Sequence, residues 1–309
     1  MTKILIATPA HGEMFYTPYV SSVIRLQRAA ARNRWETLFA SIAYADIAES
    51  RNFLLTHFYD KTDATHLLFI DADMGYEAQL VVDMINLRKP VVGIIAPRRQ
   101  IDLNRVAELA AKGESANRAI ARSHQFLIQP SKRAGKPRIV NGFIEVAGCG
   151  AGILLISRAA IKTMLEKLPD ISDTAAKKTS PLAGNLDRLI RAFDVMTVDG
   201  ARLSEDYAFC HRWREGCGGE IWANISHPIV HVGLHRFAAR YQDAMPRGPR
   251  IVVGNLPKPV KTGAAVTVKE GGGKPRVTAR PATAGNGGAP KPKAAARAAP
   301  AGGDKPREN

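Results

Sequence analysis

The sequence predicts an α/β fold built on a doubly wound, mostly parallel sheet. Residues 3–8 (KILIAT) and 66–70 (HLLFI) are short, almost wholly apolar runs, a pattern typical of strands that are covered on both faces. Segments in which apolar residues recur near the helical period separate such runs, so strands and helices alternate along the first 95 residues. This alternation favours a parallel sheet with helices on both faces.

The first half of the chain gives the clearest elements. A strand at 3–8 ends in a loop at 9–13, and a helix is expected from Thr17, with Thr17 as its N-cap and Pro18 in its first turn. The alternation continues through a strand at 36–40, a helix at 48–59, a strand at 66–70, a helix at 77–87 and a strand at 91–95. Ligands of such sheets bind where the carboxyl ends of the strands meet, so residues 8–11 and 71–73 should share one crevice.

The second half of the chain is less regular. Residues 170–190 are polar, contain Pro and Gly, and are interpreted as a mobile loop. The other expected elements are short strands at 124–129 and 138–146, a glycine-rich run at 148–152 (GCGAG), a strand at 153–156, helices at 158–168 and 204–215, a strand at 220–223 and a histidine-rich segment at 226–235.

Composition divides the chain into a folded part, residues 1–250, and a tail, residues 255–309. The tail is rich in Ala, Pro, Gly, Lys and Thr and has no aromatic residue, so we expect it to be disordered. Its eleven Lys or Arg against three Asp or Glu supply half of the net charge of +16. A basic tail can attract nucleic acid, but the absence of aromatic side chains for base stacking argues against nucleic acid as a partner.

The cysteines and the apolar segments indicate in which cellular compartment the protein is expected. Cys149, Cys210 and Cys217 are an odd number without a disulfide pattern, which favours a reducing, cytoplasmic environment. The spacing of Cys210 and Cys217 is not that of a zinc site, so we expect them to be buried. The sequence shows no signal peptide and no run of the roughly 20 apolar residues that a membrane helix needs. We therefore expect no integral membrane segment.

Asp71, Ala72 and Asp73 directly follow the apolar run 66–70. Two neighbouring carboxylates at the end of a buried strand are costly unless a cation or hydrogen bonds neutralise them. Mg²⁺ and Mn²⁺ prefer oxygen ligands and also hold phosphates. An ordinary turn or helix cap is the alternative, but the position at the carboxyl end of a strand favours a metal or nucleotide site.

HLLFIDADM at 66–74 resembles the strand and D-x-D motif of glycosyltransferases with the A-type nucleotide-sugar fold, in particular bacterial and phage-like relatives of the large family-2 group. The resemblance extends to ILIATPAHG at 4–12, ESRN at 49–52, AGCGAGILLISR at 147–158, LSEDYAFCHRWREGCGG at 203–219 and SHPIVHVG at 226–233. It covers most of residues 1–240 and none of the tail. The order of the motifs along the chain carries the resemblance.

The resemblance implies a nucleotide site at the carboxyl edge of the sheet. Thr8, Pro9 and Ala10 would hold the base, although an ordinary strand-to-helix loop explains these residues equally well. Arg51 would help to hold the nucleotide or its diphosphate, and an exposed helix arginine is the alternative there. GCGAG would border the acceptor and the donor sugar. It precedes a strand and so does not match the dinucleotide-binding fingerprint, which follows one.

The resemblance also implies a metal, Mn²⁺ or Mg²⁺, within the segment of Asp71, Ala72 and Asp73. Asp71 would lie near the ribose and the metal, and Asp73 would bind the metal directly. The metal would bridge the diphosphate and stabilise the charge on the departing nucleoside diphosphate. Enzymes of this kind often carry a further ligand, frequently a histidine, near the end of the fold, and His231 best matches that position.

Three histidines, His227, His231 and His235, are spaced by four residues, which would align them on a helix. Pro228 and Gly233 argue against a regular helix in this segment. A structural role is the ordinary one for a single histidine. The cluster of three favours a ligand among them, with His231 ahead of His227 and His235.

Ser204, Glu205 and Asp206 support two interpretations. Ser204 can cap a helix whose first turn holds two acids, which the helix dipole favours. The resemblance implies instead that Asp206 is the general base on the acceptor hydroxyl, with Glu205 in reserve. Both can hold together, because a helix start that faces the crevice is a rigid mount for a base.

The resulting expectation is a metal-dependent enzyme that moves a sugar from a nucleoside-diphosphate sugar to an acceptor hydroxyl, with inversion. The acceptor, whether a saccharide, a lipid-linked molecule or a protein, is left open. One alternative is a nucleotidyltransferase of related fold, against which stands the lack of a glycine-rich basic loop after the first strand. The other is a non-catalytic protein that binds nucleic acid or a surface, which the basic tail favours slightly and the set of acidic residues disfavours.

Overall fold

The structure is a computed structural model that describes residues 1–131, 137–184 and 186–234. The described residues belong to one compact unit, Met1–Ala238. The predicted tail at 255–309, the end of the predicted domain and His235 lie outside the described residues.

The centre of the fold is a nine-stranded sheet. Its strands, in spatial order, are β2 (Glu36–Ile42), β1 (Lys3–Pro9), β3 (His66–Ile70), β11 (Ile153–Ser157), β5 (Val91–Ile94), β16 (Ile221–Asn224), β10 (Phe143–Cys149) and β8 (Ile128–Pro130), with β9 (Ile139–Val140) paired to β10. Strands β10 and β11 run against the other strands of the sheet. The predicted mostly parallel sheet is confirmed, with β11 inserted in reverse between β3 and β5.

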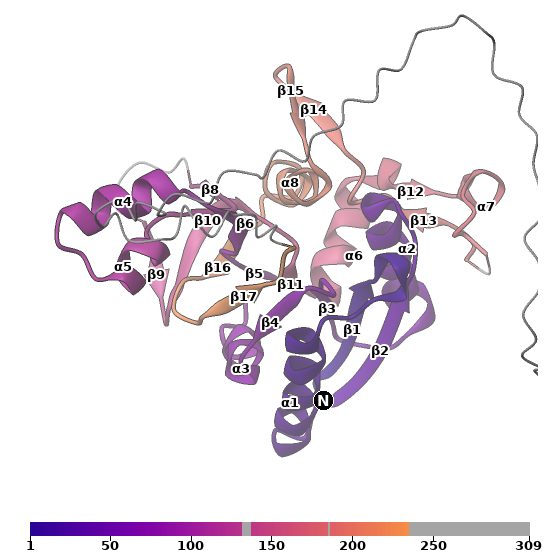
Figure 1. The fold of residues 1–309 in the computed structure, drawn as a ribbon. Coiled ribbons are helices and arrows are strands. Elements are labelled where there is room, and N and C mark those ends of the chain that lie inside the picture. The colour runs from indigo at the N-terminus through magenta and orange to yellow at the C-terminus, as the bar shows by residue number, and fades with distance from the viewer. Residues whose placement is uncertain (132–136, 185, 235–309) are drawn as a thin grey trace, which may run out of the picture. The chain divides into compact units, whose positions relative to one another are not determined.

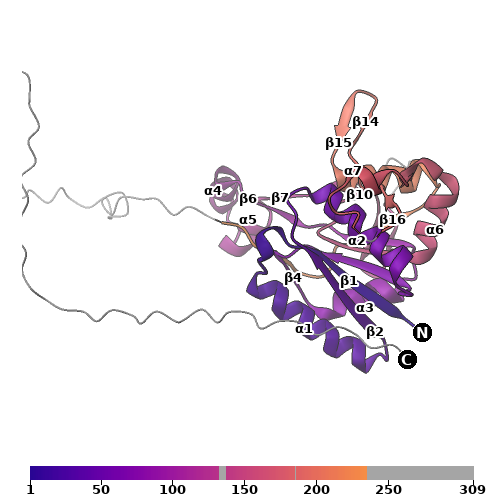
Figure 2. The same cartoon turned by 90° about the vertical axis from the view of Figure 1, so that its right-hand side faces the viewer.

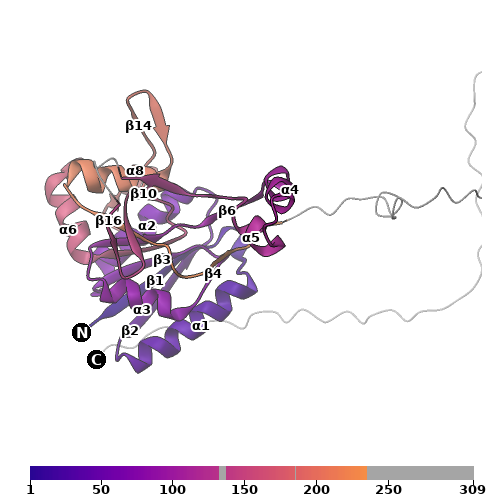
Figure 3. The ribbon, with the colours of Figure 1, turned by 90° about the vertical axis from the view of Figure 1, so that its left-hand side faces the viewer.

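Helices cover both faces of this sheet. Alternate side chains of a strand point to opposite faces, and in β1 Leu5 and Ala7 enter one core whereas Ile4 and Ile6 enter the other. The first core also contains side chains from α2 (Ile47–Lys61), α6 (Arg158–Lys167) and α8 (Glu205–His211), and the second contains those from α1 (Thr17–Arg32) and α3 (Ala78–Asn86). Figure 3 shows α1 and α3 on one side of the sheet and α2 and α8 on the other. The predicted doubly wound α/β fold is therefore confirmed.

The elements of the first 95 residues begin and end within two residues of their predicted bounds. Pro18 lies in the first turn of α1, but the N-cap is Tyr16, and Thr17 is already helical. The predicted helix at 204–215 is α-helical from Glu205 to His211 and continues as a π-helical turn, Arg212–Gly216. Residues 124–149 form β7 (His124–Phe126), β8, β9 and β10 where two strands were predicted.

The segment at 170–190, predicted as a mobile loop, contains short elements of secondary structure that were not predicted. The segment contains a 3₁₀ turn (Pro169–Ile171), β12 (Ser172–Asp173), α7 (Ala176–Thr179) and β13 (Leu189–Ile190). Leu189 and Ile190 are fully buried, and the backbone N–H of Ile190 donates to the hydroxyl of Thr56 on α2 at 2.8 Å. The buried apolar side chains in the described part of this segment lie at irregular spacings, so they produce no single period in the sequence. They are Ile171, Ala176, Ala183, Leu186, Leu189 and Ile190.

Several short elements were not predicted. Strands β4 (Met74–Tyr76) and β17 (Ile229–His231) pair with each other, and β6 (Pro97–Ile101) pairs with β7, with α4 (Leu103–Ala111) and α5 (Ala116–Ala121) between them. Strands β14 (Met196–Val198) and β15 (Ala201–Leu203) form a hairpin that lies beside α8 (Figure 1) and projects from the other elements (Figure 2). Its turn, Asp199 and Gly200, has positive φ at both residues, as a two-residue hairpin requires. None of the described helices has the length and apolar character needed to cross a membrane.

Candidate functional site

The candidate site begins at the carboxyl end of β3. The backbone N–H of Asp71 donates to the carbonyl of Gly152 at 2.9 Å, and that of Met74 donates to the carbonyl of Asp71 at 3.0 Å. A tight turn therefore separates β3 from β4, and Asp71, Ala72 and Asp73 form it. The backbone N–H of Tyr16 donates to the carbonyl of Ala72 at 3.0 Å, which joins the loop after β1 to this turn.

Arg51 on α2 holds the carboxylate of Asp71. Its Nη2 lies 3.1 Å and 3.2 Å from the two carboxylate oxygens, and its Nη1 donates to the carbonyl of Ala151 at 3.1 Å. The side chain of Arg51 is 4% exposed and that of Asp71 is 29% exposed. Burial raises the pKa of Asp71, and the charge of Arg51 counters part of that rise. Arg51 is thus a buried cation at the site and not an exposed helix residue.

The same guanidinium reaches the start of α8. Its Nε lies 3.7 Å from Oε1 of Glu205, and this buried Nε has no hydrogen-bond partner among the described residues. Burial raises the pKa of Glu205, and the neighbouring carboxylates of Asp206 and Asp71 act in the same direction. Arg51 therefore lies between two acids that are 134 positions apart in the chain, Asp71 and Glu205.

Asp206 occupies the first turn of α8. Its Oδ1 accepts hydrogen bonds from the backbone N–H of Tyr207, at 2.8 Å, and from the hydroxyl of Ser204. Ser204 occupies the N-cap position but bonds to this carboxylate in place of the helix backbone. Both donors hold Oδ1 of this carboxylate at the start of the helix.

The glycine-rich segment between β10 and β11 lies close to Asp71 and to Asp206. A methyl group at Gly152 would lie 3.6 Å from Oδ2 of Asp71, and one at Gly150 would lie 3.5 Å from Oδ2 of Asp206. Gly150 and Gly152 of GCGAG therefore lie beside Asp206 and Asp71; that this run borders the acceptor and the donor sugar stays a prediction. The absence of side chains at these two positions leaves the space beside each carboxylate open.

Asp73 lies between a histidine and an arginine. Its Oδ2 is 3.5 Å from Nε2 of His231 and 3.1 Å from Nη1 of Arg99. The pairing of β17 with β4 sets this contact, because His231 lies opposite Met74 and the N–H of Val232 donates to the carbonyl of Asp73 at 2.9 Å. Nδ1 of His231 bonds to the carbonyl of Pro97 at 2.8 Å, and the nearby carboxylate of Asp73 raises the pKa of His231.

The carboxylate oxygens at this turn and the imidazole nitrogen of His231 are of the kinds that bind a divalent cation. Nδ1 of His231 bonds to the carbonyl of Pro97, and Nε2 lies on the side of Asp73. A hydrogen bond from one ring nitrogen to a backbone carbonyl is usual in a histidine whose other nitrogen binds a metal. The described residues contain no group of three His, Cys, Asp or Glu already arranged around one point. Arg51 and Arg99 supply the positive charge beside Asp71 and Asp73. Asp71, Asp73 and His231 are the residues that could hold Mn²⁺ or Mg²⁺.

The residues predicted to hold a base are buried. The hydroxyl of Thr8 is 2.6 Å from that of Tyr19, and the N–H of Ala10 donates to the carbonyl of Ile42 at 2.8 Å. Pro9 ends β1 and is also buried. These contacts go to α1 and β2, and the carbonyl of Ala10 accepts a further hydrogen bond from the N–H of Glu13 at 3.0 Å. None of them reaches Asp71 or Asp73.

Two other histidines belong to the predicted cluster, and only His227 lies among the described residues. Nε2 of His227 bonds to Asp83 on α3 at 2.8 Å, and His235 lies outside the described residues. The three cysteines are free and buried, as predicted.

Arg99 is a site residue that was not predicted. It follows the carboxyl end of β5, where the sequence reads Pro97, Arg98 and Arg99. The rule that places ligands at the carboxyl ends of strands would have indicated it.

Neither a protein-family model nor a curated protein matches the sequence. Solved structures do resemble it. A197 from STIV has 17% identity and a TM-score of 0.38, with 78% of this chain and 98% of that chain covered. Mannose-1-phosphate geranyltransferase from Thermus thermophilus has 10% identity and a TM-score of 0.35, with 74% and 76% covered. A glycosyltransferase involved in the glycosylation of the major capsid of PBCV-1 has 8% identity and a TM-score of 0.26, with 54% and 68% covered.

Proposed function

We propose that this protein is a metal-dependent glycosyltransferase that moves a sugar from a nucleoside-diphosphate sugar to an acceptor hydroxyl. The supporting observation is the convergence of acids, a buried arginine and a histidine at the carboxyl edge of the sheet. Asp71 and Asp73 lie on the turn after β3, Glu205 is linked to Asp71 through Arg51, and His231 lies beside Asp73. Such edges are where open α/β sheets bind ligands.

In this proposal Asp71, Asp73 and His231 hold Mn²⁺ or Mg²⁺. When bound, the metal neutralises the diphosphate and the charge on the leaving nucleoside diphosphate. Arg99 lies 3.1 Å from Asp73 on an exposed stretch of β6, and its side chain is 56% exposed. Its guanidinium can turn from Asp73 to a phosphate, since both groups offer anionic oxygens as hydrogen-bond acceptors.

Asp206 is the proposed base. It takes the proton of the acceptor hydroxyl while the acceptor oxygen bonds to the anomeric carbon and the bond from that carbon to the diphosphate breaks. Attack from the face opposite the leaving group inverts the configuration. The open space at Gly150 beside Oδ2 of Asp206 would admit the acceptor. Glu205 is the less suitable base because it is paired with Arg51.

Thermal melting tests the donor site. The full chain is melted with each of several nucleoside diphosphates, with and without Mn²⁺. A ligand at a hundred times its dissociation constant stabilises the fold by about 2.7 kcal/mol. We expect one diphosphate to raise the melting temperature only with Mn²⁺, and Asp73→Ala to abolish the shift. Asp187→Ala is the matched control, because this aspartate is 83% exposed and lies outside the site. The absence of a shift with every nucleotide would reject the proposal.

A transfer assay tests the reaction. Release of nucleoside diphosphate from the donor identified by melting is followed with candidate saccharide, lipid-linked and protein acceptors. We expect Asp206→Asn to keep the melting shift and to lower the rate by about 10²–10⁴-fold, the usual worth of a general base. Full activity in Asp206→Asn would reject this residue as the base. Release of pyrophosphate from a nucleoside triphosphate and a sugar phosphate would identify a nucleotidyltransferase instead.

A further inference from the structure

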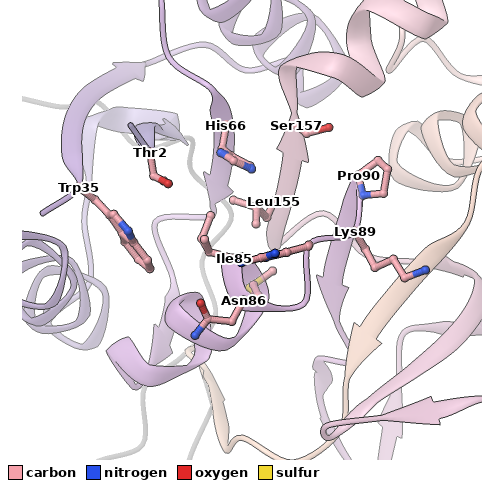
Figure 4. Close-up of a pocket in the computed structure, with 11 residues that line it drawn as sticks. Thr2, Trp35, His66, Ile85, Asn86, Lys89, Pro90, Leu155 and Ser157 are labelled. Atoms are coloured by element: carbon pink, nitrogen blue, oxygen red, sulfur yellow. The ribbon is translucent and has the colours of Figure 1, made fainter. Parts of the chain in front are cut away.

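A second pocket lies at the opposite edge of the sheet, and Figure 4 shows it. Its walls come from the residues before β1 and β2, the start of β3, the end of α3 with the loop after it, and the end of β11. The candidate active site lies at the carboxyl end of β3, so the full length of that strand separates the two. The cavity has a volume of about 440 Å³, which lies in the range of small-molecule sites. It is lined by Thr2, Trp35, His66, Met84, Ile85, Asn86, Arg88, Lys89, Pro90, Leu155 and Ser157.

The lining contains two cations and no acid. Lys89 is neutralised, because its Nζ lies 3.0 Å from Oε2 of Glu220. Arg88 is exposed, and its side chain makes no hydrogen bond or ion pair with any residue that the structure describes. The carbonyl end of α3 nearby carries about half a negative charge, which is less than the full charge of Arg88. The pocket therefore has a net positive field with one guanidinium ready to bind an anion.

One wall is a flat aromatic surface. Trp35 is partly buried and packs against the core formed with α1 and α3. In Figure 4 its indole points toward the interior of the pocket, opposite Leu155 and Ile85. A flat ring that enters between Trp35 and these aliphatic side chains would stack on the indole and displace water from apolar surface.

His66 adds a hydrogen-bond acceptor. The hydroxyl of Thr65 has one proton and donates it to the carbonyl of Lys3 at 2.9 Å. The contact of 2.9 Å between this hydroxyl and Nδ1 of His66 must then be a bond donated by Nδ1. The neutral imidazole consequently has its lone pair on Nε2. Burial lowers the pKa of His66, which keeps the ring neutral at pH 7.

From these features we propose that the pocket binds a small anion that carries a flat heteroaromatic ring with an N–H donor, the chemistry of a nucleoside monophosphate. The ring stacks on Trp35 and donates to Nε2 of His66, and the anionic group binds Arg88. This site is separate from the proposed donor site and needs no metal.

Titration calorimetry of the full chain with uridine and adenosine monophosphates, in the presence of EDTA, tests the proposal. We expect binding that Arg88→Gln weakens about tenfold, the usual loss for one charge-assisted hydrogen bond. Arg34→Gln is the matched control: Arg34 is also exposed, has φ of 58° against 55° for Arg88, and does not line the pocket. Inorganic phosphate and the free nucleoside should each bind more weakly than the nucleotide.

Fluorescence provides a second measurement on the same variants. Trp213 and Trp222 are 5% and 1% exposed, so a ligand in this pocket should quench mainly Trp35. Trp35→Phe keeps an aromatic wall and should abolish the quenching while calorimetric binding remains. Equal weakening by Arg88→Gln and Arg34→Gln, or no binding to any of these probes, would overturn the proposal. Loss of the binding in Asp73→Ala would assign it to the other edge of the sheet and would overturn it as well.

Discussion

Arg51 donates from a single nitrogen, Nη2, to both carboxylate oxygens of Asp71, at 3.1 Å and 3.2 Å. The same side chain bonds to the carbonyl of Ala151 and lies 3.7 Å from Glu205. It therefore ties α2 to the end of β3, to the segment before β11 and to the start of α8. All four acids of the candidate site lie on the two segments that Arg51 joins in this way: Asp71 and Asp73 after β3, and Glu205 and Asp206 at the start of α8.

Arg51→Met should destabilise the fold by about 2–3 kcal/mol, because it leaves the carboxylate of Asp71 poorly solvated and unpaired. Methionine keeps an apolar chain of similar length, so the loss of stability reflects the removal of the guanidinium charge. Urea denaturation measures it. In the double variant with Asp71→Asn, which removes the unpaired charge, the loss should be smaller than the sum of the two single losses. Strictly additive losses would show that the two side chains do not interact.

His231→Ala should weaken Mn²⁺ binding about 10–100-fold if His231 is a ligand, because alanine has no atom that can replace the imidazole nitrogen. The electron paramagnetic resonance signal of free Mn²⁺ measures the affinity directly and requires no substrate. His227→Ala is the control, since His227 bonds to Asp83 and lies away from Asp73. If both variants bind Mn²⁺ as tightly as the wild type, His231 is not a metal ligand.

Stability at acid pH should depend on Glu220. Hydrogen bonds from Arg138 at 2.8 Å, Lys89 at 3.0 Å and Trp222 at 3.2 Å lower the pKa of this carboxyl to about 2. A lowered pKa in the folded state means that the ionised form stabilises the fold above the unfolded value of 4.5 and that this stabilisation is lost as pH falls toward 2.

Thermal melting of wild type and Glu220→Gln between pH 7 and pH 2 measures this effect. Wild type should melt at the higher temperature at pH 7, and the difference should shrink between about pH 4.5 and pH 2. Other carboxyls titrate in the same range in both proteins, so only the difference between the two curves reports Glu220. A difference that stays constant with pH would contradict the assignment.

Two glycines should respond differently to substitution by alanine. A methyl group at Gly219 would overlap the indole of Trp213, which is 5% exposed, so Gly219→Ala should cost about 1–3 kcal/mol of stability. A methyl group at Gly150 meets only ordinary contacts, the nearest at 3.5 Å from Asp206. Gly150→Ala should therefore fold normally and raise the KM for the acceptor. Urea denaturation and steady-state kinetics measure the two effects; normal acceptor kinetics in Gly150→Ala would place the acceptor elsewhere.

Much of the first half of the fold could be predicted because its signal is local. Residues 66–70 are apolar apart from His66, and the structure has a strand with these bounds that is buried at the four apolar positions. The short elements within the loop predicted at 170–190 were missed for the opposite reason. They are held by a few separate contacts, such as Ile190 with Thr56, which leave no period in the sequence.

The candidate site divides in the same way. Asp71 and Asp73 could be recognised because two acids directly after an apolar strand are unusual, and a stretch of a few residues is enough to show this pattern. Arg99 was missed, although it also follows a strand end, because exposed arginines are common in any sequence. The buried position of Arg51 could not be derived from its helix, in which it has polar neighbours on both sides.

The sequence by itself determined most strands and helices of the first 95 residues, and that an acidic pair follows the strand at 66–70, because apolar periodicity and strand ends are properties of neighbouring residues. Only the tertiary structure decided that β11 runs in reverse, since a strand buried on both faces has the same pattern in either direction. It also decided that His231 lies beside Asp73. That contact depends on the pairing of β17 with β4, two segments more than 150 residues apart, and local sequence does not encode such a pairing.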